Sequence, residues 1–467
     1  MANGNSVTGA VADSLGRRMR VQFADPTKFA FFWLSAFYVV YCARPEDWIP
    51  GLKYAPLAKI SGIFAVLGLV MSAGKAKRSL RDLPKEAAYL AAIIGLLIIA
   101  ALLSPVWKGG AFFKTLDFAK VLVAWVLTFV VVTSFARLRR IIFIQSASVV
   151  VIAVVSLLKG RSHPRLEGVI GGIYSNPNDL AFAIVLSLPF CVAFLLSTHS
   201  IPKKLIWTFS MLAMCTTLFL TASRGGFITL LVTGAVGLWY FGVKGKRIHL
   251  VAAAALVALV VGVSAGGRLK DRFFAISGED LNSGMEVSAH GSYEQRRLLI
   301  IRSLEGIEHY PLGIGLGNFP SYSGTWREVH VAYLQIAVEG GFAAFVLYLL
   351  FFGRGFSNLR RLRGMAGNDE QTKLFVSALH SSLIGFGVGA LFAPEAFQYF
   401  PYFAVVYTSV LLAIGKEREQ LEVPRRDLSS QPQGSWRGET RACELASVRG
   451  GRAEHSRAAA ALLRNQR

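Results

Sequence analysis

The residues best suited to chemistry in this sequence are arginines in the connections between long apolar segments. Arg165, Arg224, Arg296 and Arg297 are four of them. A guanidinium group presents its N–H donors in a planar fork that matches phosphate oxygens, so these arginines are candidates for binding an anion, a phosphate group in particular. Solvated loop charges or contacts to lipid headgroups would explain the same residues, and both interpretations stay open on this evidence.

Arg224 has the most informative surroundings. It stands in the short segment Thr221-Ala-Ser-Arg-Gly-Gly226, between two apolar segments. We expect the next helix to begin here. The free backbone N–H groups of a helix start can bind an anion, and the two glycines would let a ligand approach closely. The alternative is a plain hairpin turn whose arginine reaches to the membrane surface.

A histidine and a carboxylate follow, where the chain enters another apolar segment. His330 can act as a general base near neutral pH, although an interfacial histidine is also an ordinary amphipathic residue. Glu339 lies in otherwise apolar sequence, so it needs a partner, for which an arginine of the outer face would serve. We interpret Glu339 as part of a buried structural ion pair rather than as a catalytic group.

Amide side chains are concentrated in the segment Tyr174-Ser-Asn-Pro-Asn-Asp-Leu180. Asn178 or Asp179 is predicted to cap the following helix, with Pro177 turning the chain into it. The amides of Asn176 and Asn178 could also bind sugar hydroxyls. A structural role and a glycan-binding role are therefore both compatible with this segment.

The elements that must position these residues are apolar helices. The chain has 467 residues, of which 53% are hydrophobic and 17% charged. Its apolar segments are long enough to cross a hydrocarbon core of about 30 Å, and backbone hydrogen bonds in lipid must close within each segment. We therefore predict an all-α, polytopic transmembrane bundle of about 12 spans, at 29–43, 57–73, 87–104, 117–135, 141–158, 179–196, 204–221, 227–243, 248–265, 329–353, 374–392 and 399–415.

The basic residues predict the orientation of this bundle. The net charge is +22, and much of the excess lies in short alternate connections that share a side with both termini. Short basic loops stay cytoplasmic, so we expect both termini in the cytoplasm and no binding of nucleic acid. The four arginines above then face outward, against the usual bias, which strengthens their candidacy.

Three regions flank or interrupt the bundle. We expect a cytoplasmic N-terminal segment at 1–28, a membrane domain at 29–415, and a basic, mostly disordered cytoplasmic tail at 416–467. The largest outward loop, 266–328, is predicted to contain a helix at about 292–309 that lies on the membrane surface or packs over the bundle. Glycines and prolines in 311–320 prevent a regular helix there.

Cofactor signals are not found in the sequence. The four cysteines have no paired spacing, which argues against a disulfide framework or a zinc site. We also find no phosphate-binding loop and no dinucleotide fingerprint. We therefore expect no metal and no cofactor.

At these motifs the sequence resembles the O-antigen ligase and O-antigen polymerase superfamily of bacterial inner-membrane proteins. The resemblance covers roughly residues 165–350 and rests on four features in the family's order. One departure is Val331, where the family has asparagine after the loop histidine. The family also has an arginine before the proline of the loop, which corresponds to Arg296 or its neighbour Arg297. The four features are Ser175–Ala181, Ser223–Gly226, Tyr310–Phe319, and His330 followed by Tyr333–Gln335 and Glu339-Gly340.

The resemblance implies a glycosyltransferase of cell-envelope polysaccharide biosynthesis. Its donor would be a glycan linked to undecaprenyl diphosphate, held on the periplasmic face by Arg224, Arg165 and Arg296 or Arg297. His330 would take the proton of the acceptor hydroxyl, and direct attack would invert the anomeric centre without a metal. The acceptor would be a glycolipid such as lipopolysaccharide, another glycan, or a protein. Membrane lipids are the remaining expected partners.

Ligase, polymerase and protein O-oligosaccharide ligase remain open alternatives, because they share the donor and differ in the acceptor. The sequence also leaves the oligomeric state and the role of the tail open. A membrane transporter of an organic anion or bicarbonate is an alternative of another class. Transporters place polar groups near the bilayer midplane, for which Asp117, Lys120, Glu339 and His380 are the few candidates. Asp117 and Lys120 are spaced to pair with each other.

Overall fold

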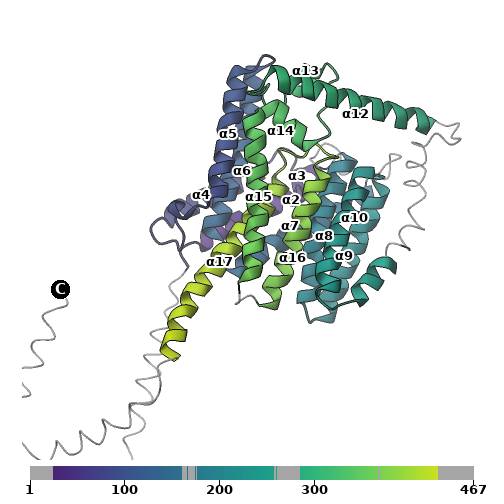
Figure 1. The fold of residues 1–467 in the computed structure, drawn as a ribbon. Coiled ribbons are helices and arrows are strands. Elements are labelled where there is room, and N and C mark those ends of the chain that lie inside the picture. The colour runs from purple at the N-terminus through teal and green to yellow at the C-terminus, as the bar shows by residue number, and fades with distance from the viewer. Residues whose placement is uncertain are drawn as a thin grey trace, which may run out of the picture. The chain divides into compact units, whose positions relative to one another are not determined.

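A computed structural model describes residues 25–159, 166, 174, 176–256, 259, 284–365 and 369–429. These residues form helices and connections, with no strand among them (Figure 1). The all-α class is therefore confirmed. In chain order the elements are α2 (Lys28–Ala43), α3 (Pro45–Trp48), α4 (Leu57–Met71), η1 (Leu80–Asp82), α5 (Lys85–Leu103), α6 (Lys108–Val131), α7 (Phe135–Lys159), α8 (Pro177–Ser197), α9 (Ile201–Leu220), α10 (Arg224–Leu238), the π-helix η2 (Trp239–Val243), α12 (Gly284–His309), α13 (Phe319–Ser323), α14 (Ala332–Gly340), α15 (Phe342–Gly364), α16 (Glu370–Gly389) and α17 (Tyr399–Ser429).

Seven helical segments in the described part of the chain are long and apolar enough to cross a membrane, judged by length and composition. The shorter apolar helices α2 and α4 have 16 and 15 residues. A multi-pass membrane protein is thereby supported, and the total of about twelve spans stays a prediction. The seven segments are α5, α7, α8, α9, α10 with η2, α15, and α17 to Gln420.

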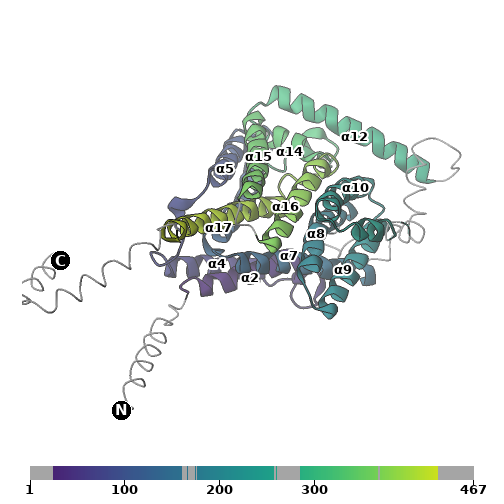
Figure 2. The ribbon, with the colours of Figure 1, turned by 60° about the horizontal axis from the view of Figure 1, so that its bottom comes forward.

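Helix α8 forms the centre of one half of the bundle. It packs against α7, α9, α10 and α16, and Figures 1 and 2 show it between these neighbours. Most of its residues are buried, because apolar side chains cover all sides of the helix. Phe194 of α8 stacks on Trp207 of α9 with ring centroids 5.0 Å apart, which joins the two helices near one end. Arg224 and Asn178 lie in the first turns of two helices of this group, α10 and α8.

The predicted span 329–353 is wrong as a single helix. The chain forms α14 and α15 there, separated at Gly341, whose φ of +85° favours glycine. Amides of the preceding loop bond to the end of α14: Ile314 N–H donates to Val338 at 3.0 Å, and Gly315 N–H to Glu339 at 3.0 Å. These bonds satisfy carbonyl groups that a helix end leaves free, so the loop itself ends α14.

The helix predicted at about 292–309 is confirmed and is longer than predicted. Helix α12 ends at His309, as expected, and begins at Gly284 rather than near 292. It packs against α13 and α14, across the end of the bundle where α14 begins (Figure 1). Leu298, Ile301 and Leu304 remain exposed on it, as expected for a helix at a membrane surface.

Helix α17 also differs from the prediction. It continues as a helix to Ser429, beyond the predicted end of the membrane domain at 415. The first compact unit of the chain is Met1–Gly415, and the second begins at Lys416. The tail beyond 429 lies outside the described residues, as do residues 1–24 of the N-terminal segment.

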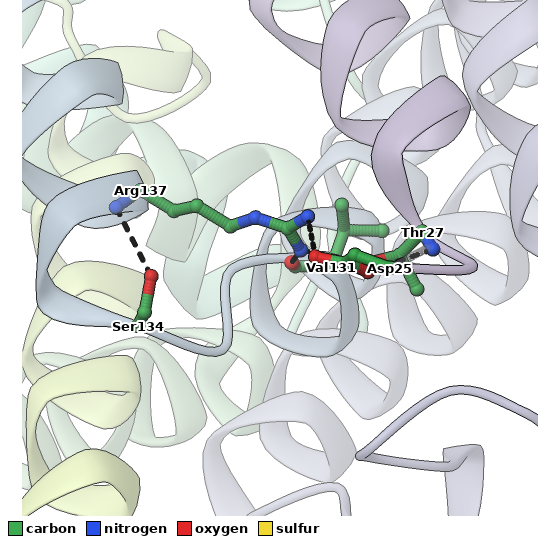
Figure 3. A network of polar contacts seen from close by, with 5 residues as sticks. All are labelled: Asp25, Thr27, Val131, Ser134 and Arg137. Atoms are coloured by element: carbon green, nitrogen blue, oxygen red, sulfur yellow. Dashed lines mark hydrogen bonds and ion pairs between the residues drawn. The ribbon is translucent and has the colours of Figure 1, made fainter. Parts of the chain in front are cut away.

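One basic residue of the predicted cytoplasmic loops has a structural role. Arg137 of α7 forms an ion pair with Asp25 and donates to the Thr27 hydroxyl at 2.7 Å and to the Val131 carbonyl at 2.8 Å (Figure 3). Its guanidinium also lies over the ring of Phe31, 4.8 Å from the centroid. These contacts join the start of α2 to the start of α7, so Arg137 has a role in packing these helices together.

Candidate functional site

A cavity of about 370 Å³ lies between α12, the segment before α14 and the segment after α16. Three of the residues that line it carry cationic or titratable groups: Arg296, Arg297 and His330. The rest of the wall is apolar. Guanidinium groups, an imidazole and an aliphatic surface therefore meet in one place, although they come from segments far apart in the sequence. The apolar lining residues are Leu299, Ile300, Ile301, Val329, Val331, Leu391 and Phe392.

Helix α12 positions the two arginines through the packing of its buried residue Leu299, which also lines the cavity. Leu299 joins a small core with Ile314, Phe319, Val329 and Val338. Burial of apolar side chains stabilises the folded state, so the contacts of Leu299 in this core fix the rotation of α12 about its axis. Both arginines line the cavity, and Arg297 also lies 4.0 Å from Glu294. The sequence left open which of the two arginines faces the site, and the structure places both in the cavity lining.

His330 is held from both sides. Val329 before it is buried in the small core, and the Ala332 N–H after it donates to the Ala390 carbonyl at 2.8 Å. Its Nδ1 atom is buried and has no hydrogen-bond partner among the described residues. Burial lowers the pKa of His330 below 6.5, and the positive charges of Arg296 and Arg327 lower it further. The ring is therefore neutral near pH 7 and can accept a proton.

The turn before α10 forms as predicted. Ser223 caps the helix by accepting from the Gly226 N–H at 3.1 Å, and Arg224 is its first residue. The Ser223 hydroxyl also donates to Asn178 Oδ1 at 2.8 Å, which ties the start of α10 to the start of α8. The Arg224 guanidinium is half-buried and has no hydrogen bond or ion pair with the described residues.

The cap of α8 differs from the prediction. Asn176, rather than Asn178 or Asp179, caps the helix by accepting from the Asn178 N–H at 3.0 Å, with Pro177 in the first helical position. Asn178 is used instead in the bond to Ser223. The structural interpretation therefore explains both amides.

The two glycines after Arg224 also have a different role from the expected one. A Cβ at Gly225 would lie 2.7 Å from the Cβ of Phe392, and one at Gly226 would lie 2.7 Å from the Cβ of Ala181. Protein side chains, rather than a ligand, therefore occupy the space that the glycines leave. Phe392 also lines the cavity, so the first turn of α10 packs against the cavity wall, although Arg224 is not one of the lining residues.

Glu339 is held by backbone amides, and the predicted arginine partner is not found among the described residues. Its Oε1 accepts from the Phe319 N–H at 3.3 Å, and the backbone of Gly317 also bonds to the carboxylate. Only 2% of the residue is exposed. Glu339 therefore fixes the loop 311–319 over the end of α14, which is a structural role.

Sequence reasoning missed a buried acidic pair near this site. Glu395, in the connection between α16 and α17, is 5% exposed and interacts with the carboxyl group of Asp179 of α8. Burial raises the pKa of Glu395 well above its usual range, and the neighbouring acids Asp179 and Glu328 raise it further. A single carboxylate in a short connection belongs to no spacing pattern. The apolar residues around Glu395 were therefore the only sign in the sequence that it is buried.

The remaining sequence candidates are accounted for as follows. Arg165 and Ser175 lie outside the described residues. Asp117 and Lys120 form the expected ion pair with each other. No group of three or more His, Cys, Asp and Glu side chains that could hold a metal ion is found among the described residues.

Comparison with known families adds one finding. A family model described as O-Antigen ligase matches residues 209–349, which include Arg224, Arg296, Arg297, His330 and Glu339. The resemblance that the motifs indicated is thereby confirmed for this superfamily. No curated protein matches the chain.

Proposed function

We propose that this relative of the O-antigen ligases is a membrane glycosyltransferase. It transfers a glycan from an undecaprenyl-diphosphate carrier to an acceptor hydroxyl on the periplasmic face of the bacterial inner membrane. The observation that carries the proposal is the cavity in which Arg296, Arg297 and His330 meet an aliphatic wall. This combination suits an amphiphilic donor, which has an anionic diphosphate beside an isoprenoid chain.

The two parts of the donor would bind to two parts of the cavity. The guanidinium groups of Arg296 and Arg297 bind the diphosphate through charge-assisted hydrogen bonds. Arg224, whose neighbour Gly225 packs against Phe392, would add a third positive charge. Arg165 lies outside the described residues and is expected to add a fourth. Leu391 is 50% exposed and Ile300 is 41% exposed, so the cavity wall continues onto an open apolar surface along which an isoprenoid chain can lie.

The transfer step follows from these positions. The acceptor oxygen attacks C1 of the donor sugar, His330 takes the hydroxyl proton, and the C1–O bond breaks with its electron pair going to the diphosphate. Negative charge therefore develops where the arginines lie, and such prearranged electrostatic stabilisation contributes about 3–4 kcal/mol for a strong donor. Diphosphate is a good leaving group, so the arginines can replace a metal ion, and direct attack inverts the anomeric centre.

The acceptor determines which member of the superfamily this is. A glycolipid such as lipopolysaccharide would make it a ligase, a second lipid-linked glycan a polymerase, and a protein hydroxyl a protein O-oligosaccharide ligase. The donor chemistry is the same in all three. A ligase is our first choice, and the match to a model described as O-Antigen ligase supports the ligase or polymerase type of activity in general.

The proposal is tested by transfer in vitro. The protein in nanodiscs is given a lipid-diphosphate-linked glycan and each acceptor class in turn. We expect transfer by the wild type and a rate lower by about 10²–10⁴-fold in His330→Ala. The matched control is His309→Ala, because His309 is exposed at the end of α12 and its ring bonds the Glu305 carbonyl. Equal transfer by both variants, or none by the wild type with any acceptor, would refute the proposal.

A further inference from the structure

A second cavity, of about 320 Å³, lies at the other end of α10. Arg224 begins α10, whereas Tyr240, which lines this cavity, lies 16 residues later in the continuous helical segment α10–η2. A rise of about 1.5 Å per residue separates the two residues by about 24 Å along the helix. The second cavity is therefore distinct from the one that contains His330, and the proposed transfer makes no use of it.

Four cationic side chains line this second cavity. Lys244 and Arg247 come from the turn after η2, Arg363 from the end of α15, and Lys373 from the start of α16. Glu370 is the one carboxylate among the lining residues, and it lies 3.9 Å from Lys373 Nζ. Four positive charges and one negative charge leave an excess of three around one hollow. Like charges repel, so this arrangement favours an anion between them.

An aromatic ring holds two of the cations in place. Arg363 lies over the ring of Tyr240, 4.2 Å from its centroid, and donates to the Tyr240 hydroxyl at 2.8 Å. Lys244 Nζ lies 5.3 Å from the same ring. Stacking and a hydrogen bond restrict the guanidinium before any ligand arrives, which lowers the entropic cost of binding. Cations that merely face water would have no such support.

The backbone turns tightly beneath these side chains. The Lys244 N–H donates to the Trp239 carbonyl at 2.8 Å, five residues back, and the Arg247 N–H donates to the Gly242 carbonyl at 2.7 Å. A Cβ at Gly245 would lie 2.2 Å from the Phe241 carbonyl oxygen, so only glycine fits the turn. Single π-turns are rare and occur frequently at functional sites. This turn directs Lys244 and Arg247 toward one cavity.

We propose that the Lys244–Arg363–Lys373 cavity binds the phosphate group of an anionic phospholipid at the membrane face opposite the donor cavity. The lining residues Phe241 and Leu374 are apolar, and exposed Trp239 and Val243 lie beside them, so an acyl chain can follow the headgroup. Inorganic phosphate has the same binding chemistry, and the experiment separates the two sources. The proposal does not depend on the transfer reaction.

The test compares ligands on the purified full chain in a neutral detergent. Dioctanoyl phosphatidylglycerol, dioctanoyl phosphatidylcholine and inorganic phosphate are titrated separately, and the thermal unfolding midpoint is followed by tryptophan fluorescence. A ligand that binds the folded state raises the midpoint. The variant Lys244→Gln/Lys373→Gln removes two cavity charges. Its matched control is Lys203→Gln/Lys204→Gln, which removes two exposed charges from the start of α9.

We expect phosphatidylglycerol to raise the midpoint saturably, with an apparent Kd weaker by about tenfold or more in the cavity variant and unchanged in the control. Arg363→Lys, which keeps the charge but loses the planar fork, should also weaken binding and guards against a misfolded double variant. If inorganic phosphate stabilises the wild type saturably and the cavity variant does not respond, the cavity is an anion site whose ligand is a soluble phosphate. Equal responses to phosphatidylglycerol and phosphatidylcholine, or equal losses in both double variants, would overturn the proposal.

Discussion

Phe392 lies directly against Gly225, so that a Cβ added to the glycine would come within 2.7 Å of the Cβ of the phenylalanine. Because Phe392 also lines the cavity with His330, this contact joins the helix that begins with Arg224 to the cavity wall. The absence of a side chain at Gly225 therefore sets how closely the half-buried Arg224 approaches the proposed donor site.

The first prediction concerns this contact. Gly225→Ala should destabilise the protein by about 1–3 kcal/mol, because the added methyl group overpacks against Phe392. Gly234→Ala, on the same helix, is the control, since nothing lies within 4 Å of its Cβ position. It should be neutral or stabilising by up to about 1 kcal/mol, because alanine is the better helix former. Thermal unfolding in detergent measures both, and equal midpoints for the two variants would contradict the packing argument.

The second prediction concerns the arginines of α12. Arg296→Ala and Arg297→Ala should each lower transfer by about 10²–10³-fold, if each guanidinium stabilises the leaving diphosphate. Arg302→Ala on the same helix is the control, because Arg302 is exposed and pairs with Glu305 at 2.9 Å instead of lining the cavity. A loss as large in Arg302→Ala would show that α12 acts through overall charge rather than through the cavity.

The third prediction concerns pH. The pKa of His330 lies below 6.5, through burial and the charges of Arg296 and Arg327. The base must be neutral, so transfer should rise with pH through this depressed pKa and level off above it. Arg327→Gln removes one of the charges without removing a residue of the cavity lining, so the acid limb should shift to higher pH. An acid limb that stays in place in Arg327→Gln, or persists in His330→Gln, would assign it to another group.

The fourth prediction concerns the buried acid Glu395. Burial, with Asp179 and Glu328 nearby, raises its pKa in the folded state above the unfolded value, so Glu395 binds its proton more tightly when folded. Its contribution to stability is then fully present below the unfolded pKa and is lost as the pH rises through the folded pKa. The unfolding midpoint should therefore fall from pH 5 to pH 8 in the wild type and fall less in Glu395→Gln. An equal fall in both proteins would contradict this.

The helices could be predicted from the sequence because a lipid environment demands long apolar runs. The segment 179–196 was placed within two residues of each end of α8 for this reason. The break at Gly341 could not be predicted, because it depends on amides at Ile314 and Gly315 that bond to the end of α14 from more than twenty residues away. The hydropathy of a segment carries no information about hydrogen bonds from residues that are distant in the sequence.

The candidate site was predicted in part. The position of His330 and of the arginines of α12, in the predicted outward connection and at its end, identified them together with the family resemblance. Their meeting in one cavity depends on the small core around Leu299, which only the folded chain shows. Glu395 and Phe392 were missed, since neither has a spacing pattern that marks it.

Donor binding measured separately from transfer tests the central claim most directly. Native mass spectrometry would follow undecaprenyl diphosphate bound to the wild type, to Arg296→Ala/Arg297→Ala and to His330→Gln. We predict that the double arginine variant loses the lipid, whereas His330→Gln retains it and yet does not transfer the glycan. Wild-type affinity in the double arginine variant would contradict the account, because the diphosphate would then bind elsewhere.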